Sequence, residues 1–273
     1  MHGLGNDFVV IDTRPGKLGG GVVIGPAEVI RIADRRTGVG CDQLILIEDA
    51  SSDDVDAFMR IHNADGSEVK ACGNATRCIG SILMTETGAD RVQIRTGADL
   101  LVVEQSGDGL ITVDMGNPRF GWEDVPLNAH ADTLHVDLTR GPLSDPAVAS
   151  MGNPHATFFV KNVEAIPLSE LGPTLEVDPV FPEKANIGIA EIKAFDRIRL
   201  RVWERGVGIT PACGTGACAA VANAVRRDLT APRVTVEVDG GDLVIDWRAD
   251  GRMSMTGPVQ TTFTGTLSSG LWA

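Results

Sequence analysis

Apolar and polar residues alternate along much of this chain in short runs, a pattern typical of half-buried β-strands. Glycine- and aspartate-rich turn sequences such as GDG, DGGD and ADG separate several neighbouring runs and predict hairpin connections. The runs predict strands at residues 7–12, 43–48, 99–105, 110–115, 156–160, 197–204, 233–238 and 242–247.

Helical periodicity is convincing at three places, which predict helices over residues 25–36, about 74–87 and about 214–228. Helices and strands do not alternate regularly, as they would in a doubly wound parallel sheet. The pattern therefore predicts an α+β fold whose sheet is mixed and mostly antiparallel.

An internal repeat links the two halves of the chain. ACGNATRCIG at 71–80 matches ACGTGACAAV at 212–221, and LGNDFVV at 4–10 resembles MGNPHATFFV at 151–160. Coincidence in glycine- and alanine-rich sequence explains either match alone, but not two matches in the same order at nearly the same spacing. We therefore expect that one strand-rich half has been used twice.

The repeat predicts two domains. We expect the first at residues 1–115 and the second at 116–259, with the last segment, about 260–273, returning to the first domain.

Composition excludes several classes of protein. The chain has 273 residues, 43% of them hydrophobic and 22% charged, which is ordinary for a soluble globular protein. A net charge of -13 without any lysine- or arginine-rich run argues against a nucleic-acid partner. We expect neither a signal peptide nor a membrane span, because no basic segment followed by an apolar stretch opens the chain and no apolar run is long enough. Five sparse cysteines favour the cytoplasm over a secreted disulfide framework.

Cys72 and Cys213 hold equivalent positions in the repeat, each just before a predicted helix, and Asn63 and Glu204 stand nine residues before them. The first turn of a helix has backbone N–H groups without intrahelical partners, so it binds an anion such as a carboxylate or a phosphate. The same position favours a thiolate over a thiol, which predicts a lowered pKa for both cysteines.

Two such thiols suit the inversion of a stereocentre that carries a carboxylate. If the two halves face each other about a pseudo-two-fold axis, one thiolate removes the Cα proton while the opposite thiol gives a proton to the other face. The two thiols exchange these roles in the reverse direction.

Other interpretations of the cysteines fit less well. Cys213 and Cys218 are five residues apart, and Cys72 and Cys78 six, so neither pair shares a helix face for zinc binding. Cys78, Cys218 and Cys41 are expected to be small buried residues. We expect no metal and no cofactor, because no nucleotide fingerprint follows a strand and none of the five lysines has a recognisable pyridoxal context.

Six blocks of sequence together resemble the diaminopimelate epimerase family: MHGLGNDFVVID, GCDQLILIE, NADGSEVKACGN, MGNPHATFFV, ANIGIAEI and WERGVGITPACGTGACAA, spread from residue 1 to about 222. The resemblance implies cofactor-independent interconversion of LL- and meso-2,6-diaminopimelate for lysine and peptidoglycan precursors. It implies Cys72 and Cys213 as the two bases. It further implies a homodimer, and two similar domains, each a sheet curled around a central helix, with the substrate in the cleft between them.

The resemblance also assigns roles to individual residues. Asn63, Asn186, Glu204 and Arg205 fall on substrate contacts, as do Asn6, Gln43 and Asn153. Gly73, Asn74, Gly214 and Thr215 fall on backbone donors. His155 and Glu204 fall on positions that tune the thiol pKa values, and the alternative for His155 is a strand-capping hydrogen bond. Helix N-termini would take the reacting carboxylate, and Glu204 and Arg205 would bind the distant amino acid end.

Three residues depart from the family pattern: Ala75 and Ile209 replace a common glycine and glutamate, and Phe263 replaces a common interface tyrosine. Two alternatives remain at the sequence level. One is a proline-racemase-like enzyme of the same architecture, against which the asparagine, Glu204 and Arg205 set argues. The other is a non-catalytic thiol protein, such as a redox-responsive binder.

Overall fold

The chain divides into two units of similar construction. The computed structural model describes residues 1–50, 52 and 54–268. Unit 1 holds Met1–Val113 and the C-terminal segment that begins at Gly257, and unit 2 holds Asp114–Thr256. The chain passes from one unit to the other within two of its strands, β8 and β18. None of the helices in the described part of the chain combines the length and apolar character needed to cross a membrane.

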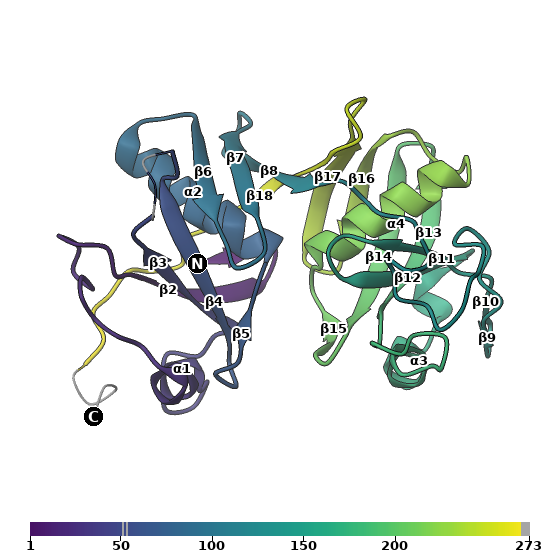
Figure 1. Cartoon of the computed structure of the whole chain (residues 1–273), viewed down its shortest axis with the longest axis horizontal. Coiled ribbons are helices and arrows are strands. Elements are labelled where there is room, and N and C mark those ends of the chain that lie inside the picture. The colour runs from purple at the N-terminus through teal and green to yellow at the C-terminus, as the bar shows by residue number, and fades with distance from the viewer. Residues whose placement is uncertain (51, 53, 269–273) are drawn as a thin grey trace. The chain divides into compact units, whose positions relative to one another are not determined.

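Unit 1 is built from eight strands and two helices in the described residues (Figure 1). In chain order they are β1 (His2–Gly3), β2 (Asn6–Asp12), α1 (Pro26–Ala33), β3 (Gln43–Glu48), β4 (Ala57–Asn63), β5 (Glu68–Val69), α2 (Gly73–Thr87), β6 (Arg91–Arg95), β7 (Leu100–Gln105) and β8 (Leu110–Gly116), whose end lies in unit 2.

Unit 2 repeats this plan with an additional short hairpin and a 3₁₀ turn. Its elements are β9 (Thr139–Arg140), β10 (Leu143–Ser144), β11 (Ala147–Ser150), β12 (Pro154–Val160), η1 (Val163–Ala165), α3 (Leu168–Glu176), β13 (Asn186–Ala194), β14 (Arg197–Glu204), β15 (Gly208–Thr210), α4 (Gly214–Arg226), β16 (Arg233–Val238), β17 (Gly241–Trp247) and β18 (Met253–Pro258), whose end lies in unit 1.

The two units have the same strand order. In unit 1 the strands follow β1-β2-β3-β4-β6-β7-β8, and in unit 2 they follow β11-β12-β13-β14-β16-β17-β18. The parallel pairs correspond, β2–β3 with β12–β13 and β4–β6 with β14–β16. The short strands β5 and β15 pair with β4 and β14, each at the end that leads toward a cysteine. A mixed, mostly antiparallel α+β fold is therefore confirmed.

Each unit packs one helix into its sheet (Figure 1). Helix α2 buries Ile79, Leu83 and Met84 and contacts β1, β6 and β7. Helix α4 contacts β11, β12, β13, β14 and β17, and ten of its thirteen residues are buried. Most of these residues are alanine, glycine or valine, so the helix backbone can lie close to the strands on several sides.

The eight predicted strands are all present, with bounds that differ by at most two residues. Helix α1, predicted over 25–36, ends at Ala33 because Asp34 is extended (ψ 121°) and its carboxylate accepts the N–H groups of Arg36 and Thr37. Ten strands in the described part of the chain, and helix α3, were not predicted; the strands are β1, β4, β5, β6, β9, β10, β11, β13, β15 and β18. Polar residues interrupt the apolar pattern of β4, and Pro173 lies inside α3.

Candidate active site

The predicted site residues fall into two clusters, one in each unit. We call them the N half-site (Asn6, Gln43, Asn63, Cys72, Gly73 and Asn74) and the C half-site (Asn153, His155, Asn186, Glu204, Arg205, Cys213, Gly214 and Thr215). Each is described by itself.

Cys72 in the N half-site is the residue that caps the start of α2. Its backbone is extended (φ −151°, ψ 107°), and its carbonyl accepts the first intrahelical N–H, from Thr76, at 2.9 Å. The N–H groups of Gly73 and Asn74 belong to the first turn of α2, before the Thr76 N–H that makes the first intrahelical bond. The sequence predicted this helix start, and N–H groups in a first turn are suited to binding an anion. The Cys72 thiol is partly buried, and its Sγ lies 3.9 Å from Asn6 Oδ1.

Asn6 connects this thiol to a charged cluster at the start of β2. Its Oδ1 also accepts a hydrogen bond from Asn74 Nδ2 at 3.3 Å, while its own Nδ2 donates to Asp42 Oδ2 at 2.9 Å. Arg35 contacts Asp42 Oδ1 at 2.7 Å and both oxygens of Asp7 at 2.8 Å. Asp42 was not among the predicted site residues, although it lies in the quoted GCDQ block.

Gln43 and Asn63 form the second part of the N half-site. They are directly opposite each other on β3 and β4, and Gln43 Nε2 donates to Asn63 Oδ1 at 3.1 Å. Asn63 Nδ2 in turn donates to Ser67 Oγ at 3.1 Å. Strand register therefore places two amides from distant parts of the sequence side by side.

Cys213 in the C half-site caps α4 in the same way that Cys72 caps α2, with extended backbone (φ −121°, ψ 108°). Gly216 is closely packed here: a Cβ at that position would lie 3.2 Å from Cys213 Sγ and 3.2 Å from Val202 Cγ2, so these side chains would have to shift by a few tenths of an ångström. Unlike Cys72, the thiol is almost fully buried, with 4% of the residue exposed.

The pKa of Cys213 is raised well above its ordinary value, first by burial and then by the negative charge of Glu204. Hydrogen bonds from the Gly216 N–H and the Thr215 hydroxyl act in the opposite direction but are outweighed. The sequence-based prediction of a lowered pKa is therefore wrong for Cys213, because burial was not visible in the sequence.

Asn153 in the C half-site is the equivalent, in the sequence repeat, of Asn6 in the N half-site. Its Oδ1 lies 3.0 Å from His155 Nε2, and its Nδ2 donates to Thr215 Oγ1 at 3.4 Å. The Thr215 hydroxyl is 3.7 Å from Cys213 Sγ. Burial, and then the Arg205 charge, lowers the pKa of His155 to about 3, so the imidazole is neutral at pH 7.

The two asparagine amides point in opposite directions relative to their cysteines. Asn6 turns its oxygen toward Cys72, whereas Asn153 turns its NH₂ group toward Thr215, the hydroxyl neighbour of Cys213. The repeat therefore conserves the position of the asparagine but not the hydrogen-bonding group that it presents.

The remaining C half-site residues lie at the ends of β13 and β14. Asn186 is buried, donates to the Pro154 carbonyl at 2.9 Å and accepts the Arg205 N–H at 2.9 Å. The Arg205 side chain is exposed and donates to the Glu183 carbonyl at 2.9 Å. Glu204 Oε1 accepts a 2.5 Å hydrogen bond from Thr210 Oγ1, a residue that no sequence signal singled out.

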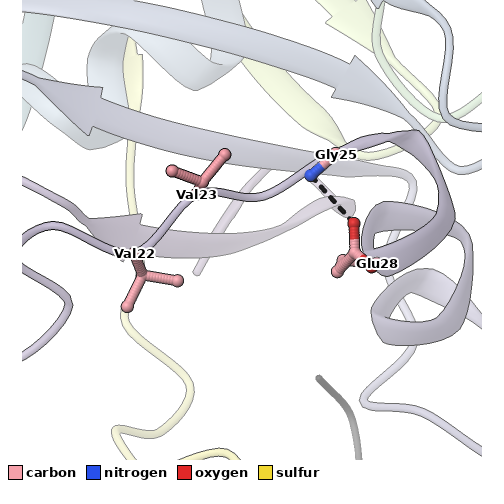
Figure 2. A pocket seen from close by; sticks show the side chains of 4 residues that line it. All are labelled: Val22, Val23, Gly25 and Glu28. Carbon is pink, nitrogen blue, oxygen red and sulfur yellow. Dashed lines mark hydrogen bonds between the residues drawn. The ribbon is translucent and has the colours of Figure 1, made fainter. Parts of the chain in front are cut away.

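A surface hollow of about 550 Å³ lies apart from these residues, at the start of α1 in unit 1 (Figure 2). It is lined by Val22, Val23, Gly25 and Glu28. The Glu28 carboxylate accepts the Gly25 N–H at 3.0 Å, so the charged group of this hollow already serves as a helix cap. The hollow contains none of the predicted site residues.

Sequence comparisons identify close relatives over the whole chain. The family model described as diaminopimelate epimerase matches residues 1–121 and 147–262. A protein named diaminopimelate epimerase from Acidiphilium cryptum is 56% identical, over 100% of this chain and 96% of its own. One of the same name from Rhodospirillum centenum is 51% identical, over 99% and 92%.

Solved structures share the fold at much lower identity. A hydroxyproline epimerase from Agrobacterium vitis, with bound trans-4-hydroxy-L-proline, has a TM-score of 0.67 and 16% identity over 94% of this chain and 87% of that one. A predicted epimerase from Pseudomonas aeruginosa has a TM-score of 0.65 and 17% identity over 96% and 93%. The family model and the full-length relatives show that this chain belongs to the diaminopimelate epimerase family.

Proposed function

We propose that this chain interconverts LL- and meso-2,6-diaminopimelate by moving protons between the substrate Cα and the thiols of Cys72 and Cys213. Membership of the family makes the chain an isomerase of lysine biosynthesis.

One observation carries the assignment of the two cysteines. Each caps the central helix of its unit, in two units that share their strand order, and no other cysteine holds such a position in the described residues. Cys41, Cys78 and Cys218 are buried, and burial raises the pKa values of Cys41 and Cys78 to about 11 and about 12.

In the proposed reaction one thiolate removes the Cα proton, and the other thiol delivers a proton to the opposite face of the carbanion. The Cα–H bond breaks, its electron pair stays on carbon, and a new C–H bond forms with the second thiol's proton. Helix-start N–H groups at Gly73, Asn74, Gly214 and Thr215 support the carboxylate that stabilises this charge. Burial and Glu204 favour the thiol form of Cys213, which suits it to the acid role in one direction; in the reverse direction Cys72 is the acid and acts from its thiol form.

The distant amino acid end of the substrate is assigned to the polar residues at the strand ends. Arg205 is suited to a carboxylate and Glu204 to an ammonium group. Five amide side chains supply both hydrogen-bond donors and acceptors: Asn6, Gln43, Asn63, Asn153 and Asn186. A substrate without that end leaves these groups unpaired and is expected to be rejected.

The proposal is tested by measuring solvent deuterium incorporation into LL-diaminopimelate. Cys72→Ala and Cys213→Ala should each lower turnover by roughly a thousandfold, because each removes a proton carrier. Cys78→Ser and Cys218→Ala, at buried cysteines of the same two helices, serve as controls and should retain turnover if they fold. Near-normal turnover in Cys72→Ala or in Cys213→Ala contradicts the two-thiol mechanism. Turnover of proline with none of diaminopimelate supports the racemase alternative instead.

We further propose that the enzyme works in the cytoplasm as a homodimer. The sparse cysteines support the compartment, and the family resemblance supports the dimer. Phe263, at the position where relatives place an interface tyrosine, is exposed in the single chain (66%) and is available for such a contact. Sedimentation of the wild type beside Phe263→Ala tests the dimer, which a monomeric wild type contradicts.

A further inference from the structure

Asp42 stands directly before β3, beside the first residues of β2. Because β2 and β3 are parallel, this register brings Asp42 next to Asn6 and Asp7. The Asp42 N–H donates to Asp7 Oδ1 at 2.7 Å, and the Asp7 N–H donates to Asp42 Oδ2 at 3.1 Å. Two reciprocal hydrogen bonds therefore hold the Asp42 carboxylate at the edge of the N half-site.

The two oxygens of Asp42 have separate partners. Oδ1 accepts from Arg35 Nη2 at 2.7 Å, and Oδ2 accepts from Asn6 Nδ2 at 2.9 Å. Removing Arg35 therefore removes the ion pair while leaving the Asn6 contact in place. The chain itself thus offers a control that separates the two interactions.

We propose that Asp42 is a positioning residue that fixes the orientation of the Asn6 amide and so turns its oxygen toward the Cys72 thiol. A carboxylate only accepts hydrogen bonds, so the NH₂ end of Asn6 must face Asp42 and the oxygen must face away from it. That oxygen is the atom 3.9 Å from Cys72 Sγ and 3.3 Å from Asn74 Nδ2. The inference rests on the proposed function, in which Cys72 is one of the two proton carriers.

The fixed orientation matters for the reaction because it decides which group the thiol meets. In the direction in which Cys72 is the acid, the amide oxygen accepts the S–H hydrogen and holds the thiol in one orientation, whereas a rotated amide presents N–H donors, which favour the thiolate. Without Asp42 the Asn6 amide can turn by half a rotation, and a fraction of the molecules then present the wrong group. The loss is therefore expected in kcat more than in KM.

The experiment compares Asp42→Ala with Arg35→Gln in the full-length enzyme, using the steady-state rate of LL-diaminopimelate turnover. Asp42→Ala should lower kcat about tenfold with KM within about threefold, the size expected for one lost charge-assisted hydrogen bond. Arg35→Gln should keep kcat within about twofold of the wild type. Both variants remove the Arg35–Asp42 ion pair, and Arg35→Gln also removes the Arg35–Asp7 pair, so both should lower the melting temperature.

A double-mutant cycle supplies a readout that a merely structural role would not move. In an Asn6→Ala background, Asp42→Ala should cost less than about twofold in kcat, because its only route to the thiol is already absent. If Asp42→Ala does not fold, Asp42→Asn takes its place. With one acceptor oxygen for three donors, from Asn6, Asp7 and Arg35, Asp42→Asn should lose part of the activity, and more than Arg35→Gln does.

Equal losses of kcat in the Asp42 and Arg35 variants would overturn the inference, as would an undiminished cost of Asp42→Ala in the Asn6→Ala background. A wild-type chain that does not turn over diaminopimelate contradicts the proposed function instead. An active wild type that stops exchanging only in the Cys72 and Cys213 variants leaves the proposed function standing whatever happens at Asp42.

Discussion

Both the Cys213 thiol and the neighbouring Glu204 carboxylate have hydroxyl partners, Thr215 and Thr210. The Glu204 carboxylate raises the pKa of Cys213, after burial the second largest influence on that thiol. Glu204 is itself held by the Thr210 hydroxyl through a 2.5 Å hydrogen bond. The position of the charge that acts on Cys213 therefore depends on a residue in the short strand β15.

Thr210→Val tests this dependence at the scale of one residue. Valine has the shape of threonine without the hydroxyl, so the variant should lower kcat about tenfold, in line with the loss of one hydrogen bond to a charged group. Thr210→Ser restores the donor and should recover most of the activity. The two variants are compared by steady-state kinetics. Equal activity in the valine and serine variants would show that the hydroxyl has no role in turnover.

The central helices set the positions of both cysteines, and both helices approach their strands closely. Gly80 in α2 lies against β7, where a Cβ would be 2.4 Å from Val103 Cγ1. Alanine and glycine on α4 serve the same purpose in unit 2. Small side chains are therefore a packing requirement of these helices, since larger ones would move the helix start that carries the thiol.

Gly80→Ala should destabilise the protein by about 1–3 kcal/mol, because overpacking against Val103 outweighs the better helix propensity of alanine. Unfolding in urea measures the change. Val103→Ala removes the side chain that a Cβ at position 80 would meet. The loss in free energy of unfolding caused by Gly80→Ala should therefore be smaller in a Val103→Ala background than in the wild type. A stabilising effect of Gly80→Ala in the otherwise normal chain would contradict this account of the packing.

Strands were easier to predict than helix ends and interrupted elements. Residues 197–204 alternate apolar and polar residues over most of their length, residues 43–48 form a short apolar run, and the structure has strands with the same bounds. Strand β4 alternates Met59 and Ile61 with Arg60 and His62, but over too few residues to stand out in the sequence. Its existence depends on pairing with β3 and β6.

At the scale of the whole molecule, the repeat seen in the sequence is also a repeat of topology. Both units place a parallel crossover helix, α1 or α3, between corresponding strands, and both place a cysteine at the start of the central helix. The units differ in how they surround that cysteine: Cys72 is partly buried and Cys213 is buried. A shared backbone plan therefore holds two chemically different thiols.

The free energy of unfolding should depend on pH through His155. Its pKa is about 3 in the folded protein, against an ordinary value of 6.5, so between these values only the unfolded chain binds the proton. The contribution of His155 to the free energy of unfolding is at its maximum above pH 6.5 and decreases as the pH falls toward 3. At pH 5 the free energy of unfolding is lower by roughly 2 kcal/mol for this reason. Urea unfolding from pH 7 to 4 should show a steeper decline for the wild type than for His155→Gln. Parallel curves would contradict the assignment.

The sequence by itself determined the fold class, the repeat, the two cysteines and their place at helix starts, because these depend on local periodicity and on composition. The tertiary structure alone decided that Cys213 is buried beside Glu204, that Thr210 donates a hydrogen bond to Glu204, and that Asp42 accepts one from Asn6. These contacts join residues on different strands or loops. Strand register decides which of them meet, and the sequence pattern predicts the strands without fixing that register.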